Sequence, residues 1–310
     1  MTPGRLYFIM GSTASGKGEL GRELARRIGG RIVSVDSMKV YRRMDIGTAK
    51  PPAQVRAAIP HYCLDLVEPW EPFSVAAFVD AADQAVADIR AAGAIPLAVG
   101  GTSLYIKALS EGLFEGPGAD PALRDELRRR AQDQGLAALH EELSRLDAQA
   151  AGRIHPHDER RILRALEVHR LTGLPISQLQ RQWDAGRRRY EAVFIGIRRP
   201  REDLHRRINL RVARMIEAGL VQEVQALLAD PRGLSPQAAQ AVGYAEVIQF
   251  LQGQTSLQKA IEEIKISTRQ LAKKQRTWQR RWVDVRWFDA APDEPPEALA
   301  DRVGGEVAFT

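Results

Sequence analysis

The sequence lacks the residues and runs on which several classes of protein depend. Cys63 is the only cysteine among 310 residues, which excludes an internal disulfide and a zinc site with several cysteine ligands. No run approaches the roughly 18 apolar residues of a membrane-spanning helix. The apolar stretch after Arg5 is too short for the core of a signal peptide. The sequence also lacks internal repeats, and together these absences predict a soluble cytoplasmic protein.

The charge balance is basic. The chain has 45 Lys and Arg against 39 Asp and Glu, a net charge of +6, and a pI of about 9.6. Such a balance favours nucleic-acid partners, but an even spread of +6 would be weak evidence. The distribution of the basic residues therefore carries more information than their number.

Short apolar runs alternate with helical patterns in the first part of the chain. The runs read as buried strands over 6–10, 31–35, 95–99 and 193–197, with helices over 19–28 and 75–92. Strands that alternate with helices indicate an α/β fold with a parallel sheet.

The pattern changes near Gly116, where helices over 121–134, 136–150 and 158–171 follow without a strand between them. We predict a helical insertion domain over 116–190 within a catalytic core formed by 1–115 and 191–310. That these helices simply pack on the sheet is the alternative. Further helices are predicted over 201–217, 220–229, 236–251 and 256–282, with a strand over 283–288. The acidic residues from Pro292 onward read as peripheral.

The first strand runs into a phosphate-binding loop with one departure. A P-loop reads G-x-x-x-x-G-K-[ST], and the chain has Gly11-Ser12-Thr13-Ala14-Ser15-Gly16-Lys17-Gly18. Backbone N–H groups and the lysine hold phosphate oxygens, whereas the final hydroxyl holds Mg²⁺. The loop thus keeps the groups that bind a diphosphate and lacks the metal-binding hydroxyl. A chance glycine-rich turn is the alternative interpretation.

Polar residues follow two other strands at the carboxyl end of the sheet, where α/β proteins form their sites. Asp36 could bind a metal or act as a general base, and Thr102 offers a donor and an acceptor. Each is about equally well explained as a helix cap or turn residue. In the loop that follows Met44, Thr48 and Lys50 are a weak signal for a phosphate ligand.

Basic residues form patterns in three places. Arg269, Lys273, Arg276 and Arg280 follow i, i+4, i+7, i+11 spacing, which puts four cations on one helical face. Two further clusters are Arg160, Arg161 and Arg164, and Arg187, Arg188 and Arg189. Charge runs are usually solvated faces, but three clusters favour a polyanionic partner.

A second helix carries Arg207, Arg211 and Arg214 at i, i+4 and i+7. Their guanidinium groups could bind a diphosphate. Salt bridges to Glu202 and Asp203 are the equally plausible alternative.

The motifs together resemble those of the tRNA dimethylallyltransferase (tRNA isopentenyltransferase) family. In order over about 5–290, they are G-S-T-A-S-G-K, S-V-D-S, M-D-I-G-T-A-K-P, V-G-G-T, G-Y and T-R-Q-L-A-K-K-Q-x-T-W. The resemblance implies a P-loop kinase-like core with an inserted helical domain. It also implies transfer of a dimethylallyl group from dimethylallyl diphosphate to the exocyclic amine of the adenosine 3′-adjacent to the anticodon. The products are N6-(dimethylallyl)adenosine and diphosphate, and the expected cofactor is Mg²⁺. The implied partner is the tRNA anticodon stem-loop, bound by a cytoplasmic monomer that does not contact a membrane.

The resemblance also assigns roles to residues. Asp36 is implied as the general base, with Lys17, Thr102 and Arg207 as further catalytic residues. The implied diphosphate ligands are Gly11, Ser12, Thr13, Ala14, Ser15, Gly16, Lys17, Gly18, Arg207 and Arg211. The implied tRNA contacts are Asp36, Ser37, Met38, Lys39, Thr102, Arg124, Arg160, Arg161, Ile162, Leu163, Arg164, Gln240, Ala241, Val242, Gly243, Tyr244, Ala245, Arg269, Lys273 and Arg276.

Four positions depart from the family pattern: Gly18 replaces Thr, Ser12 replaces Pro, Lys39 replaces Gln, and Gln279 replaces an aromatic residue. Only Gly18 touches the chemistry, because it leaves the ligands of Mg²⁺ unassigned. Three rival functions stay open: an isopentenyltransferase acting on free adenine nucleotides, a P-loop kinase of a small metabolite, and a non-catalytic RNA-binding relative.

Overall fold

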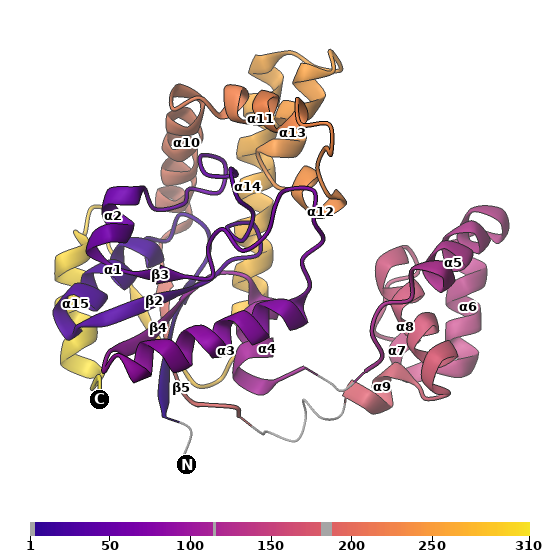
Figure 1. Ribbon diagram of the computed structural model, residues 1–310, viewed down its shortest axis with the longest axis horizontal. Coiled ribbons are helices and arrows are strands. Elements are labelled where there is room, and N and C mark those ends of the chain that lie inside the picture. Colours follow the sequence, from indigo (N-terminus) through magenta and orange to yellow (C-terminus); the bar gives the residue numbers. More distant parts are fainter. Residues whose placement is uncertain (1–3, 114–115, 181–187) are drawn as a thin grey trace. The chain divides into compact units, whose positions relative to one another are not determined.

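The computed structural model describes residues 4–113, 116–180 and 188–310 (Figure 1). The chain divides into two compact units, one formed by Met1–Ser110 with Arg189–Thr310 and the other by Glu111–Arg188. None of the helices in these described ranges combines the length and apolar character of a bilayer span.

The first unit is built on a six-stranded parallel sheet, which confirms the predicted fold class. The strand order is β3-β2-β4-β1-β5-β6. The strands are β1 (Arg5–Gly11), β2 (Gly30–Val35), β3 (His61–Tyr62), β4 (Ile95–Gly100), β5 (Glu191–Arg198) and β6 (Val285–Asp289). Only β3 was missed, because two residues are too few to give a pattern.

Ten helices are described in this unit. They are α1 (Lys17–Ile28), α2 (Ala53–Ala58), α3 (Val75–Ala91), α4 (Ser103–Glu111), α10 (Arg201–Glu217), α11 (Leu220–Leu228), α12 (Pro236–Ala239), α13 (Tyr244–Leu251), α14 (Leu257–Gln279) and α15 (Pro296–Glu306). The single helix predicted over 236–251 is wrong. Gly243 interrupts it with a φ of 97°, a conformation that favours glycine, and the Glu246 carboxylate accepts from its N–H.

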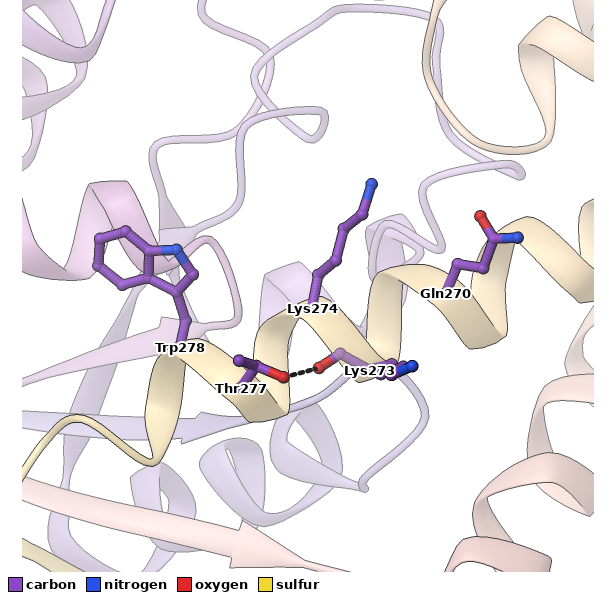
Figure 2. A pocket seen from close by; sticks show the side chains of 5 residues that line it. All are labelled: Gln270, Lys273, Lys274, Thr277 and Trp278. Carbon is purple, nitrogen blue, oxygen red and sulfur yellow. Dashed lines mark hydrogen bonds between the residues drawn. The ribbon is translucent and has the colours of Figure 1, made fainter. Parts of the chain in front are cut away.

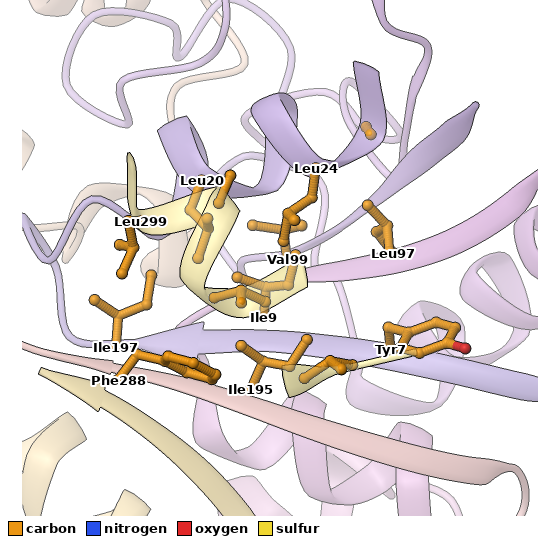
Figure 3. Packing of buried hydrophobic residues seen from close by; sticks show 14 of the residues in the cluster. Tyr7, Ile9, Leu20, Leu24, Leu97, Val99, Ile195, Ile197, Phe288 and Leu299 are labelled. Carbon is orange, nitrogen blue, oxygen red and sulfur yellow. The ribbon is translucent and has the colours of Figure 1, made fainter. Parts of the chain in front are cut away.

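A hydrophobic core holds α1, the helix that follows the phosphate loop, against the sheet. Ile9 of β1 packs with Leu20 and Leu24 of α1, together with residues from β4, β5, β6 and α15 (Figure 3). The prediction of a peripheral C-terminus is wrong, because Leu299 and Val303 of α15 are buried in this same cluster. The helix is acidic on its outer side only, and α15 packs directly on α1.

A second core joins α10, α11, α13 and α14 to the segment around Tyr41 and Met44. Ile208 of α10, Tyr244 of α13 and Ile264 of α14 are members of this cluster. It anchors the long basic helix α14 on the first unit.

The second unit is entirely helical in its described part. Its helices are α5 (Pro121–Gln134), α6 (Leu136–Leu146), α7 (Ala148–Ala151), α8 (Glu159–Thr172) and α9 (Ile176–Leu179). The helix predicted over 136–150 is divided at Asp147, whose carboxylate caps α7 by accepting from Ala150 N and also accepts from Ser177 N, both at 2.9 Å. Leu127, Leu143 and Ile162 are among the residues that form the core of the unit.

Candidate functional site

The phosphate loop lies between β1 and α1, which is the context that the motif requires. Gly16 precedes the helix in the left-handed region with a φ of 95°. Gly11 has no room for a side chain, since a Cβ there would lie 2.5 Å from Ser15 Oγ. Lys17 Nζ donates to the carbonyl of Ser12 at 3.2 Å. The side chain of Lys17 thus folds back over the phosphate loop, where we expect it to bind a phosphate oxygen.

Three side chains from outside the loop hold its backbone. The N–H of Thr13 donates to Gln275 Oε1 at 2.7 Å, and Arg207 Nε donates to the carbonyl of Ala14 at 2.9 Å. Arg199 Nε donates to the carbonyl of the next residue at 2.8 Å. Arg199 and Gln275 were missed from the sequence, because each lies in a run of polar residues that gives no hint of a distant partner. The loop is therefore preorganised from α10, α14 and the end of β5.

The position of Arg207 decides between its two sequence-based interpretations. Its guanidinium also binds Glu19 Oε2 at 3.2 Å, beside the phosphate loop. The alternative of salt bridges to the first turn of α10 is wrong for this residue, because Asp203 pairs with Arg199 and Arg206. The structure places Arg207 next to the loop, and its contact with a diphosphate stays a prediction.

Asp36 and Thr102 come together at the carboxyl ends of β2 and β4. Thr102 Oγ1 accepts from the N–H of Ser37 at 3.1 Å, and Asp36 Oδ1 accepts from the N–H of Met38 at 3.0 Å. The strands approach very closely here, since a Cβ on Gly100 would lie 2.0 Å from the carbonyl oxygen of β2's last residue. Both side chains thus have structural contacts, and Asp36 makes no hydrogen bond through Oδ2 to any residue that the structure describes.

Three cations share the electrostatic surroundings of Asp36. Burial lowers the pKa of Lys17 to about 8; the Asp36 carboxylate opposes this shift, while Lys39 and Arg211 reinforce it. Burial also lowers the pKa of Lys39 and of Arg211, again against the effect of Asp36. The carboxylates that act on these cations are Asp36 and, for Arg211, Glu19, which is already paired with Arg207, so positive charge is in excess. The site is therefore suited to an additional anion.

The loop after Met44 proves to be structural. The side chain of Lys50 is only 1% exposed, and its ammonium binds Asp45 at 2.8 Å and Asp65 at 2.6 Å. Thr48 Oγ1 donates to the carbonyl of Met44 at 2.7 Å. The hypothesis that Thr48 and Lys50 offer phosphate ligands is wrong, because both polar groups point inward and are already bonded.

A basic groove lies between α10 and α14. It has a volume of about 530 Å³, and Arg201 and His205 of α10 line it together with Arg269, Lys273 and Arg276 of α14 and Arg280, which follows that helix. No acidic side chain is among the described residues that line it. Burial lowers the pKa of His205, and the nearby arginines lower it further. The predicted stripe is thus confirmed as a surface, and Arg201 and His205 are additions that only the packing of α10 reveals.

Not every member of the stripe is free. Arg269 donates to Asn209 Oδ1 at 2.7 Å, and its Nε is buried with no partner in the described part of the chain. Around the turn of α14, a second hollow of about 480 Å³ is lined by Lys274 and Trp278, which lie one turn apart on the helix (Figure 2). An aromatic ring and a cation that line the same hollow suit a nucleic-acid base and its phosphate.

Most basic residues of the cluster in the helical unit, and Arg124 beside them, form ion pairs within the unit. Arg124 and Arg164 both bind the fully buried carboxylate of Glu167, at 2.8 and 2.6 Å. Arg161 pairs with Asp158 at 3.4 Å, and Arg160 is exposed. Arg161 and Arg164 of the predicted cluster, and Arg124 beside them, are thus ion-paired within the unit, and their contact with tRNA stays a prediction.

Burial limits which predicted tRNA contacts can use a side chain. Ile162 and Leu163 are 0% and 7% exposed, and Tyr244 is 0% exposed. Any contact with RNA at these positions has to involve the backbone or a neighbour, such as the exposed Gln240. In the third basic cluster Arg187 lies outside the described residues, and Arg189 pairs with Asp83.

Comparison with known families places these features in context. The family model described as IPP transferase matches residues 39–282. The tRNA dimethylallyltransferase of Geobacillus kaustophilus (strain HTA426) is 47% identical over 306 residues, which cover 98% of this chain and 96% of the relative. That of Anaeromyxobacter dehalogenans (strain 2CP-C) is 45% identical over 299 residues, with coverage of 96% and 99%.

Solved structures agree. The full-length tRNA isopentenylpyrophosphate transferase from Bacillus halodurans is 38% identical with a TM-score of 0.70, covering 98% of this chain and 96% of that one. A eukaryotic dimethylallyltransferase acting on tRNA is 28% identical with a TM-score of 0.77, covering 93% and 74%.

Proposed function

Because the chain belongs to the tRNA dimethylallyltransferase family, we propose that it transfers a dimethylallyl group from dimethylallyl diphosphate to tRNA. The acceptor is the exocyclic amine of the adenosine 3′-adjacent to the anticodon, and the enzyme acts as a cytoplasmic monomer. The observation that carries this proposal is the cluster of Lys17, Lys39 and Arg211 around Asp36 at the mouth of the phosphate loop. This cluster combines excess positive charge for an anion with the carboxylate of Asp36 for a proton.

The cations serve the leaving group. The amine nitrogen forms a bond to C1 of the dimethylallyl group, and the C1–O bond breaks, so that diphosphate leaves with the electron pair. Lys17, Arg211 and the loop N–H groups stabilise the developing negative charge. Arg207 and Arg199 hold the loop carbonyls, so the N–H groups are fixed before the substrate arrives.

Asp36 accepts the proton of the amine. An adenine amine is a weak nucleophile, and a positioned carboxylate helps as its N–H becomes acidic in the transition state. Thr102 holds the N–H of Ser37 and so positions the turn that carries Asp36. Asp36 Oδ1 is engaged by Met38, which leaves Oδ2 for the substrate.

The basic groove and the helical unit bind the RNA. A base in a structured loop has to leave its stack to reach the phosphate loop, at a cost of about a few kcal/mol. Phosphate contacts from Lys273 and Arg276 offset this cost, and Arg160 adds an exposed cation from the helical unit. A free nucleotide would need no such groove, which disfavours transfer to free adenine nucleotides.

The family transfers prenyl groups, which generally requires a divalent metal, and Mg²⁺ is our predicted cofactor. The described residues contain no group of three or more His, Cys, Asp or Glu that could hold an ion. A Cβ on Gly18 would face Arg22 Nη1 at 3.5 Å, so a metal at this position would meet a cation and no hydroxyl. The chain's own residues do not fit a metal there. We therefore propose Mg²⁺ only as a counter-ion carried by the diphosphate.

One experiment separates the candidate functions. The protein is incubated with labelled dimethylallyl diphosphate and with unmodified tRNA, AMP or neither acceptor, and Asp36→Ala is assayed beside it. We expect label on tRNA alone, none with Asp36→Ala, and tRNA affinity of that variant within about threefold of the unmodified chain. Label on AMP but not tRNA would refute the proposal, and full transfer by Asp36→Ala would remove Asp36 as the base. ATP turnover with a small acceptor would favour a kinase.

A further inference from the structure

Gly18 and Arg22 lie one helical turn apart on α1 and form a pair. Side chains of a helix tilt toward its N-terminus, so a residue at i+4 covers the turn that contains residue i. Apart from its chain neighbours and the backbone of α1, the one described atom within 4 Å of a Cβ on Gly18 would be Arg22 Nη1, at 3.5 Å. The guanidinium therefore lies beside the position where a P-loop places its metal-binding hydroxyl.

The charge of Arg22 has no partner of opposite charge among the residues that the structure describes. Across the ranges that the structure describes, its half-buried guanidinium makes no hydrogen bond or ion pair, whereas Arg26 and Arg27 of the same helix both bind Glu23. Its charge helps to lower the pKa of Lys39 and of His61, though burial is the larger cause in both. Arg22 thus adds repulsion to a cluster that is already cationic.

We propose that Arg22 is a phosphate ligand that takes the place of the hydroxyl and metal at position 18. This inference rests on the proposed function, since it deepens the diphosphate site of the same reaction. A guanidinium offers several donors in a planar fork that matches phosphate oxygens. Gly18 is part of the arrangement: a Cβ there would already be in van der Waals contact with the guanidinium at 3.5 Å, so the γ atoms of a threonine would compete with Arg22 for the same space. The chain therefore binds diphosphate without a protein-held metal.

Calorimetric titration with inorganic pyrophosphate in EDTA tests the proposal without tRNA or turnover. We expect binding by the unmodified chain, a loss of about 10- to 100-fold for Arg22→Gln, and partial recovery for Arg22→Lys. The control is Arg26→Gln, which removes the same charge one turn further from the loop and should leave affinity unchanged. Equal affinities of Arg22→Gln and Arg26→Gln would overturn the proposal, as would an absence of pyrophosphate binding by the unmodified chain.

A double-mutant cycle tests the pairing with Gly18. Gly18→Thr should weaken binding in EDTA by displacing Arg22, and Gly18→Thr with Arg22→Gln should bind well only when Mg²⁺ is added. The two changes should then be strongly non-additive. Additive losses, or the same Mg²⁺ requirement in all four proteins, would contradict the exchange of metal for arginine. Transfer to tRNA is assayed separately, so Arg22-dependent pyrophosphate binding without transfer would count against the proposed function and leave this inference intact.

Discussion

Gln275 of α14 accepts a hydrogen bond from the N–H of Thr13 at 2.7 Å, across 262 residues of sequence. Its carboxamide nitrogen donates in turn to the carbonyl of Gly101 at 2.9 Å. One side chain therefore joins the phosphate loop to the turn that precedes Thr102. Because its neighbours Lys274 and Arg276 face the two hollows of α14, the helix that we propose to bind RNA also braces the diphosphate site.

Loss of this brace should slow transfer more than it weakens RNA binding. In Gln275→Ala the N–H of Thr13 and the carbonyl of Gly101 lose their partner, so the loop is less preorganised for the leaving group. We expect kcat to fall about tenfold and the Kd for tRNA to stay within about twofold. Single-turnover assays and filter binding measure the two quantities. Gln258→Ala, an exposed glutamine of the same helix, should change neither, and equal effects of the two substitutions would contradict the bracing role.

The lowered pKa of Lys17, about 8 because of burial, makes diphosphate binding pH-dependent. Above pH 8 the free protein loses the ammonium charge, so the affinity for pyrophosphate should fall by up to about tenfold per pH unit. Pyrophosphate itself changes protonation over this range, which alters the affinity of both proteins equally. The ratio of the affinity of the unmodified chain to that of Lys17→Met therefore reports on Lys17 alone. A ratio that stays constant between pH 7 and 10 would contradict a role for the Lys17 charge.

The same shift predicts a cost in stability. The folded chain releases the Lys17 proton near pH 8, whereas the unfolded chain holds it up to about 10.5. The unfolded state thus binds more protons between these values, so the free energy of unfolding should rise with pH there. Below pH 8 the penalty is fully present, and Lys17→Met should melt at a higher temperature than the unmodified chain.

The sequence predicted the parts of the site that depend on neighbours in the chain. The strand–loop–helix context of Lys17 and the stripe on α14 follow from local periodicity, and both were found. Contacts between segments that are distant in the sequence could not be predicted from it. Nothing near Lys50 signals that its ammonium meets Asp65 and the Tyr41 carbonyl inside a loop, and nothing near Gln275 points to the phosphate loop. A cluster of basic residues in a sequence also suggests charges that are free to bind a partner, although Arg164 is paired with the buried carboxylate of Glu167.

That glutamate should be essential to the helical unit. Burial alone would raise the pKa of Glu167, but hydrogen bonds from Arg124, Arg164 and the Asp120 N–H outweigh it and lower the pKa below 4.5. Glu167→Ala leaves two arginines without their shared partner and should destabilise the unit by about 3 kcal/mol. Glu126→Ala, which breaks an exposed pair with Arg170, should cost less than about 1 kcal/mol.

Hydrogen exchange of the α8 amides in urea reports on this unit separately from the sheet. The stabilising contribution of Glu167 is present at neutral pH and is lost as the pH falls below 4.5 toward its folded-state pKa. Similar losses for the two alanine variants would mean that the buried pair adds no more than a surface one.

The basic groove predicts how RNA binding should respond to salt. Each lysine or arginine that neutralises a phosphate releases a counter-ion, so removing it should reduce the slope of log K against log salt by about 0.7 to 0.9. Lys273 and Arg276 line the groove. Lys273→Ala and Arg276→Ala should therefore each weaken tRNA binding and reduce the salt-dependence slope by this amount. Lys259→Ala removes an exposed lysine at the other end of α14 and should leave the slope unchanged. Weaker binding with an unaltered slope would instead mean that Lys273 and Arg276 support the shape of the helix surface and touch no phosphate.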